Sequence, residues 1–178
     1  MRICRIIALG AALLVPGVGT TLQQLSLNDL VQKSTAIVRG KAQLTSSALK
    51  GSIIYTHYKV QVTEQWKGSP AALIDVAVPG GTVNGRMQTF SGAPVFNTGQ
   101  EYIFFLWTSR SGLTQVMGLS QGIFNLTPSS TGDLLVARAA ATDRMVNAAG
   151  TEINDSNFSM RLPDFKSRVT TALVKGSN

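Results

Sequence analysis

The chain has 178 residues, of which 44% are hydrophobic and 14% are charged, and its formal net charge is +7. This length and composition are typical of one folded domain that can bury a core. The 16 lysines and arginines are scattered along the chain. Because they form no basic run, we expect no nucleic-acid partner.

The first 19 residues match a secretory signal peptide. Arg2 and Arg5 precede an apolar run, Ile6–Val15, which ends at Pro16. Charge, apolar run and small residues follow in the order that signal peptides have, and the run is too short to cross a bilayer as a helix. We therefore expect cleavage near Gly19 and a secreted or periplasmic location.

Removal of residues 1–19 would leave 159 of the 178 residues, 20–178, which we expect to form a single domain. It would also remove Cys4, the one cysteine, and lower the formal charge from +7 to +5 through Arg2 and Arg5. A cysteine-free mature chain has no disulfide and no thiol chemistry. That is normal for an exported bacterial protein.

The mature chain opens with a predicted helix and three strands. Ser26 and Asp29 have the spacing of a capping box, which predicts a short helix over Leu25–Ser34. After it the apolar residues alternate, as they do in half-buried strands. These strands are expected at Ala36–Leu44, at Ile53–Trp66 with a bulge at Glu64, and at Leu73–Val78.

The second half predicts more strands and a closing helix. Residues 80–100 are rich in glycine and predict a long loop, and residues 140–160 are polar and predict another. Further strands are expected at Glu101–Trp107, at Leu113–Leu126, as one long strand or as two interrupted at the glycines, and at Leu134–Ala140. The last element, Leu162–Val174, places Phe165 and Val169 on one helical face.

This order of elements indicates a mainly β fold. Five to seven antiparallel strands follow a short N-terminal helix and precede a C-terminal helix. A small curved sheet with many glycine bends favours a partly closed, OB-like barrel. A two-sheet sandwich is the alternative.

Residues 118–122, GLSQG, match the G-x-S-x-G signature of serine hydrolases. That signature needs a helix after the serine, whereas the residues that follow Ser120 are typical of a strand. The single histidine, His57, precedes Ser120, so only the order His57, Asp75, Ser120 remains, and enzymes with that order need two barrels. We therefore expect no catalytic residue and no enzyme activity, and interpret the two glycines as bends in a strand.

The sequence also predicts no metal site and no cofactor. Ser47 and Lys50 match S-x-x-K, but the partner motifs K-T-G and S-D-N are missing. One histidine and scattered carboxylates do not provide the clustered ligands that a metal ion needs.

The polar face of the second predicted strand is one candidate for ligand contact. Alternation places four side chains on it, namely Tyr55, His57, Lys59 and Gln61. This face is either a binding surface or an ordinary solvated strand face.

The glycine-rich segment 80–100 is the other candidate, because loops of this length are often functional. Arg86, Gln88 and Phe90 would contact the ligand. In the alternative, the segment covers an open end of the barrel, with Phe90 and Phe96 as its plug.

Several stretches carry a resemblance to a known family: AIVRGKAQL, YTHYKVQVTEQWKG, VAVPGG, SGAPVFNTGQEYIFFLW and MGLSQGIFNL. Over residues 25–126 their order resembles uncharacterised bacterial exported domains. More distantly, it is similar to the OB-type barrel of tissue inhibitors of metalloproteinases and netrin-like modules. Those inhibitors bind the protease zinc through an N-terminal cysteine, which the mature chain lacks. The resemblance therefore implies a fold and export, and it carries over no inhibitory mechanism.

These observations predict an exported, non-enzymatic β-barrel binding module whose partner is a protein or an envelope polymer. One alternative is an inhibitor or accessory domain of a peptidase, which would act by loop insertion. A second alternative is a serine hydrolase that uses His57, Asp75 and Ser120.

Overall fold

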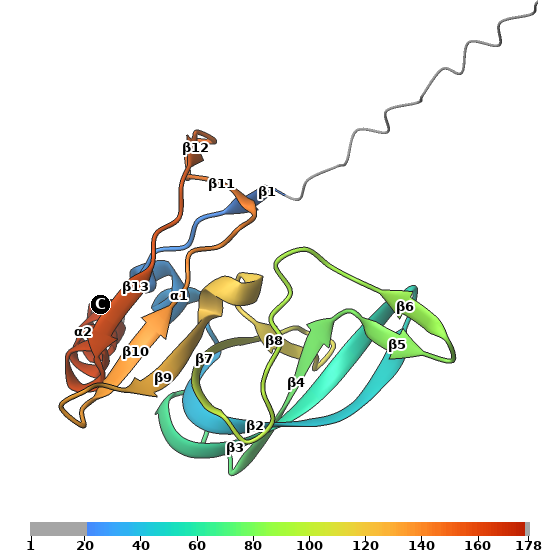
Figure 1. The fold of residues 1–178 in the computed structure, drawn as a ribbon, viewed down its shortest axis with the longest axis horizontal. Helices are drawn as coiled ribbons and strands as arrows, with labels where there is room; N and C mark the ends of the chain where they lie inside the picture. The colour runs from blue at the N-terminus through green and yellow to red at the C-terminus, as the bar shows by residue number, and fades with distance from the viewer. Residues whose placement is uncertain (1–20, 177–178) are drawn as a thin grey trace, which may run out of the picture.

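The computed structural model describes residues 21–176, and the predicted signal peptide lies outside them. The fold is mainly β with two α-helices, as the sequence predicts, and its main sheet is antiparallel (Figure 1). Within residues 21–176 no helix is long and apolar enough to cross a membrane.

Eight strands form the main sheet. Seven of them have the order β13-β10-β9-β7-β2-β3-β4, and β8 pairs with the C-terminal end of β7, beyond β9. Their bounds are β2 Ala36–Lys50, β3 Ile53–Lys67, β4 Leu73–Pro79, β7 Glu101–Thr108, β8 Thr114–Val116, β9 Ile123–Pro128, β10 Leu134–Arg138 and β13 Phe158–Arg161.

Two smaller sheets and the helices complete the fold. One sheet joins β1 Thr21–Gln23, β11 Arg144–Val146 and β12 Glu152–Ile153, and the other joins β5 Gly81–Val83 and β6 Arg86–Gln88. The helices are α1 Leu27–Lys33, α2 Leu162–Lys175 and a single 3-10 turn, η1, at Leu119–Gly122. The three-stranded sheet projects from the body of the molecule (Figure 1).

The predicted capping box starts α1. Ser26 Oγ accepts a hydrogen bond from Asp29 N at 3.0 Å, and the Asp29 carboxylate accepts one from Ser26 N at 3.1 Å. The hydrogen bond from the Ser26 hydroxyl is the main reason that the pKa of Asp29 is lowered. This pair satisfies two backbone donors that a helix start leaves free.

The hairpin of β2 and β3 is long, with 15 residues in each strand. Its pairing register shifts on both sides of Glu64, so the predicted bulge is present. At Gly40 the strands approach closely, and a Cβ there would lie 2.6 Å from the Gln61 carbonyl oxygen. Only glycine fits this position without a shift of the backbone.

The strand pairing of the described residues does not close into a barrel. The strands β4 and β8, although not paired, lie next to each other. Asp75 and Ala77 of β4 and Thr114 of β8 line the same small hollow. The sheet therefore curls, and five of its strands (β2, β3, β4, β7 and β8) surround one apolar core.

Two local expectations were wrong. GLSQG does not bend a continuous strand, because η1 interrupts it: Gly118 has φ 63° and Leu119 has φ 57°. Residues 140–160 are not all loop, because β11 and β12 form a hairpin there around Asn147 and Gly150. Its strands have only three and two residues, which is too short for an alternating pattern to be detected in the sequence.

The two faces of β7 belong to two separate cores, because alternate side chains of a strand point in opposite directions. The loop-side core consists of Val38, Ala42, Tyr58, Val60, Val76, Val78, Phe96, Tyr102, Phe104, Leu106, Val116 and Ile123. The helix-side core consists of Leu30, Val31, Ile37, Ile103, Phe105, Phe124, Val136, Phe165, Val169 and Ala172. The predicted helical face of α2 is thus confirmed by Phe165 and Val169.

Candidate functional site

The structure separates the two predicted sets of contact residues. Thr56 and Tyr58 of β3 line the same cavity as Gln88 and Phe90, whereas His57 lines a different one. Neighbouring residues of a strand point to opposite sides. The face of β3 that carries His57 and the segment that carries Phe90 therefore do not form one site.

The β3 face itself is mostly solvated. Lys59 and Gln61 are exposed, and Tyr55 and His57 are half-buried. His57 Nδ1 lies 3.0 Å from Asp75 Oδ1 on the neighbouring strand. The hollow beside this pair has a volume of only about 180 Å³. Such a hollow is smaller than most ligand pockets, which start at about 300 Å³.

In the glycine-rich segment, Gln88 is an anchor. Its side-chain oxygen accepts a hydrogen bond from Ile54 N at 2.6 Å, and its amide nitrogen donates to Ser52 O at 2.8 Å. Gln88 thereby ties β6 to the start of β3. Arg86, at the start of β6, is exposed.

Residues 89–97, the crossing segment, follow β6 and run over the loop-side core to β7 (Figure 1). Phe96 is the plug of this core: it is 5% exposed, and its ring packs against Tyr58, Tyr102 and Phe104. Phe90, the other expected plug, is 39% exposed. Only half of the predicted plug is therefore present.

Hydrogen bonds hold the end of the crossing segment in place. Asn97 N donates to the Tyr102 hydroxyl at 2.9 Å, and the backbone of Phe96 bonds to the Tyr58 hydroxyl. Burial raises the pKa of Tyr58, and the bond from Phe96 offsets part of this rise. Between these anchors and Gln88, the segment presents Val95, which is 83% exposed.

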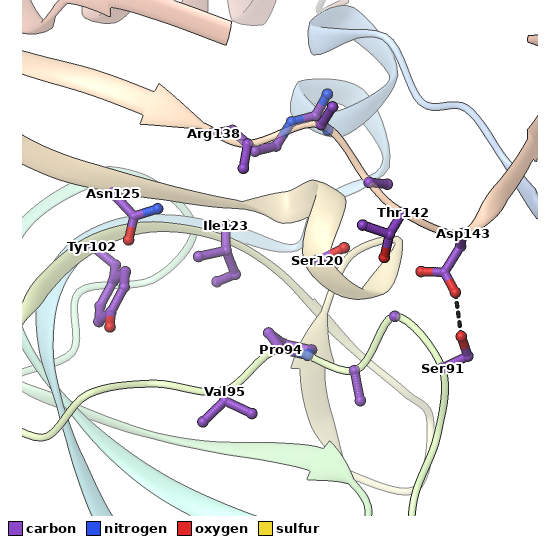
Figure 2. Close-up of a pocket in the computed structure, with 15 residues that line it drawn as sticks. Ser91, Pro94, Val95, Tyr102, Ser120, Ile123, Asn125, Arg138, Thr142 and Asp143 are labelled. Carbon is purple, nitrogen blue, oxygen red and sulfur yellow. Dashed lines mark hydrogen bonds between the residues drawn. The ribbon is translucent and has the colours of Figure 1, made fainter. Parts of the chain in front are cut away.

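Two cavities flank the crossing segment, and Ala93, Pro94 and Val95 line both of them. The smaller, of about 240 Å³, lies toward β3 and Phe90. The larger, of about 410 Å³, is the main cavity, and its volume is within the range of ligand pockets. Figure 2 shows Ile123 on its opposite wall.

The main cavity presents polar groups, most of which are neutral. The hydroxyls of Ser120 and Thr142 line it, and neither has a hydrogen-bond partner within residues 21–176. Asn125 adds a side-chain amide. The carboxylate of Asp143 accepts a hydrogen bond from Ser91, which joins the crossing segment to the opposite wall (Figure 2).

Arg138 contributes little charge to the main cavity, because its side chain points away from Pro94 and Val95 (Figure 2). Its guanidinium bonds to the buried Asp155 carboxylate at 3.2 Å and to the Gln121 carbonyl at 3.4 Å. The Arg138–Asp155 pair therefore holds the wall in shape.

The arrangement does not assemble a serine protease triad. His57 and Ser120 line different cavities, and no hydrogen bond joins them. Among the described residues no three histidine, cysteine, aspartate or glutamate side chains lie close enough to hold a metal ion.

The sequence reasoning missed the walls of the main cavity, which are contributed by Asn125, Ser120 and residues 138–143. One signal was present, because Arg138 continues the alternation of Leu134 and Val136 and so places a charge on a buried strand face. Such a residue needs a partner inside the fold.

Comparisons with protein-family models, with curated proteins and with solved structures found no match.

Proposed function

We propose that this chain is an exported, non-enzymatic binding module that holds a protein partner on its crossing segment. In this proposal the strands β2, β3, β4, β7 and β8 form a partly open, OB-like barrel. The closeness of β4 to β8 around one core supports the barrel. Export rests on the signal-peptide pattern of residues 1–19.

The observation that carries the proposal is an exposed apolar crest on an anchored segment. Met87, Phe90 and Val95 are 74%, 39% and 83% exposed. Their neighbours in the chain are fixed, Gln88 by its hydrogen bond to Ile54 N and Phe96 by its packing in the loop-side core. Contact groups that are already ordered lose little entropy on binding. An apolar crest between two hollows is suited to a protein surface, because interface cores are apolar and shape-complementary.

The test is capture of a partner from the proteins that the same cells export. Immobilised wild-type protein should retain a specific protein, and Val95→Asp should lose it, because the carboxylate would be desolvated in the interface. Val174→Asp is the matched control, since Val174 is also exposed, at 63%, but lies on α2. A partner that is retained equally by all three proteins would contradict the proposal.

Inhibition of a peptidase is the second candidate, and the exposure of Val95 on an anchored loop favours it. An inserted loop must be rigid and must present a side chain at its crest. Val95→Asp should then relieve inhibition of a captured peptidase, whereas Val174→Asp should not. If the captured partner has no peptidase activity, binding without inhibition is the function.

A further inference from the structure

We infer that the main cavity accepts an extended polypeptide segment, which adds as a strand along residues 139–142. This inference rests on the proposed function, because it names the part of the protein partner that the crossing segment and its neighbouring cavity recognise. It requires three things: a gap in the sheet, free backbone groups along the gap, and room for a chain.

The gap lies where β9 and β10 part. Their pairing ends at Ala137 and Asn125, although β9 itself begins two residues earlier, at Ile123. Over those two residues β9 remains paired with β7 on its other side. The main cavity lies at this point, with Ile123, Asn125 and residues 138–143 in its walls.

Free backbone groups follow along residues 139–142. The N–H groups of Ala139 and Thr142 and all four carbonyl oxygens of this stretch have no hydrogen-bond partner among the described residues. The N–H groups of Ala140 and Ala141 bond to Asn157 and Asp155, and these bonds fix the stretch in place. Unpaired main-chain groups that continue from the end of a sheet strand are a template for an added strand.

The opposite wall has the same character. The N–H of Val95 and the carbonyls of Pro94 and Val95 also have no partner among the described residues. The cavity between the two stretches has a volume of about 410 Å³. An inserted chain would thus meet free main-chain groups on both sides.

The side chains of the cavity favour a peptide over an anionic ligand, because the carboxylate of Asp143 also lines it. Ala139, Ala140 and Ala141 are short, so they leave the main chain beside them accessible. The free polar side chains, Ser120 and Thr142, are neutral and can bond to peptide groups of any sequence. Strand addition takes its affinity from main-chain hydrogen bonds of this kind. A sugar polymer would not require the free strip of main chain.

The test uses α-lactalbumin whose cysteines are reduced and alkylated with iodoacetamide, which provides a long unfolded chain as the probe. Ala139→Pro removes a free N–H without breaking a hydrogen bond, and Arg138 before it is already extended, as proline requires. Ala148→Pro is the control, because Ala148 N–H is also free and lies in the exposed turn of the β11–β12 hairpin. Equal urea midpoints for both variants and the wild type would show that the fold is kept.

We expect Ala139→Pro to weaken binding of the probe about tenfold, as the loss of a main-chain hydrogen bond does, and Ala148→Pro to leave it unchanged. If Ala139→Pro does not fold, amide exchange of the wild type decides: the probe should slow exchange at Ala139. Protection at Val95 alone would overturn strand addition and leave the proposed function standing. Failure of the probe to bind, or binding of sugar polymers instead, would also overturn the inference. The proposed function is tested separately: it fails only if Val95→Asp leaves capture of the partner unchanged.

Discussion

The two faces of β7 are closed in different ways. On one face, Ile103 and Phe105 pack under α1 and α2, where Phe165 contacts the rings of four other aromatic residues. On the other face, Tyr102 and Phe104 are covered by the crossing segment, which reaches the core mainly through the ring of Phe96, with Ala93 packed at its edge.

Under the proposed function, this difference separates the part of the protein that gives stability from the part that binds a partner. Within a helix most backbone groups bond to one another, so the helix side offers few free main-chain groups to a partner. The crossing segment and residues 139–142 leave backbone groups free and border the main cavity. Binding residues are commonly carried by loops that a rigid scaffold positions. We therefore expect substitutions on the helix side to lower stability and substitutions on the loop side to lower binding.

The largest loss of stability is expected for Phe165→Ala. Phe165 is fully buried, and its removal should lower the free energy of unfolding by about 4–5 kcal/mol. Urea denaturation measures this, with the exposed Val174→Ala as a control that should change little. At urea concentrations where the variant stays folded, partner capture should be unchanged. A loss below about 2 kcal/mol would mean that the helix-side core repacks and fills most of the space that the Phe165 ring leaves.

Phe96→Ala should cost less stability, about 3 kcal/mol, and more binding. The side chain anchors the crossing segment, so its removal should free the segment as well as leave a cavity. Amide exchange of residues 89–97 should accelerate, and partner capture should weaken under conditions where the protein is folded. Unchanged capture would show that Gln88 and the Ser91–Asp143 bond are sufficient anchors.

Much of the helix side could be predicted from the sequence, because local patterns specify it. The capping box of Ser26 and Asp29, the apolar stripe of α2 and the strand β7 are all present as expected. Such patterns depend on residues a few positions apart. The mainly β class followed from them as well.

The main cavity could not be predicted in this way, since its walls come from segments far apart in the chain. Residues 89–97 and 138–143 meet only through tertiary contacts such as the Ser91–Asp143 hydrogen bond. GLSQG was read as a bend for the same reason. Leu25 packs against Gly118, and its N–H donates to Gln121 Oε1, while Gln121 Nε2 donates to Gln23 O. None of these contacts is visible in a local pattern.

Gly122→Ala should lower stability by about 2–3 kcal/mol. A Cβ at Gly122 would lie 2.4 Å from the Met117 carbonyl oxygen and 3.1 Å from the Phe105 carbonyl oxygen, so the backbone would have to shift. Ser120→Ala in the same motif is the control. It removes a hydroxyl with no partner among the described residues and should change stability by less than about 0.5 kcal/mol. A fluorophosphonate probe tests whether Ser120 is catalytic. Labelling of the wild type that is lost in Ser120→Ala would contradict the structural interpretation of GLSQG.

The smallest effect on stability is expected for Glu101→Gln, at the start of β7, and the size of this effect depends on pH. Burial raises the pKa of Glu101, but hydrogen bonds from Arg39 Nη2 and Thr63 Oγ1, each of 2.7 Å, outweigh burial and lower it overall. A carboxyl whose pKa is lower in the folded state than in the unfolded state stabilises the fold at pH values above its unfolded-state pKa. This stabilisation is lost as the pH falls through the folded-state pKa. Glu101→Gln should therefore cost about 1–2 kcal/mol at pH 7.

Well below pH 4.5, the ordinary pKa of the carboxyl, the variant and the wild type should become equally stable. Urea denaturation over a series of pH values measures the difference. Glu152→Gln is the control, because its pair with Arg144 is exposed and should contribute little. Glu101 does not line the main cavity, so capture by folded Glu101→Gln should match the wild type at pH 7. A variant that lost capture without losing stability would show that the ion pair of Arg39 and Glu101 serves the binding side of β7.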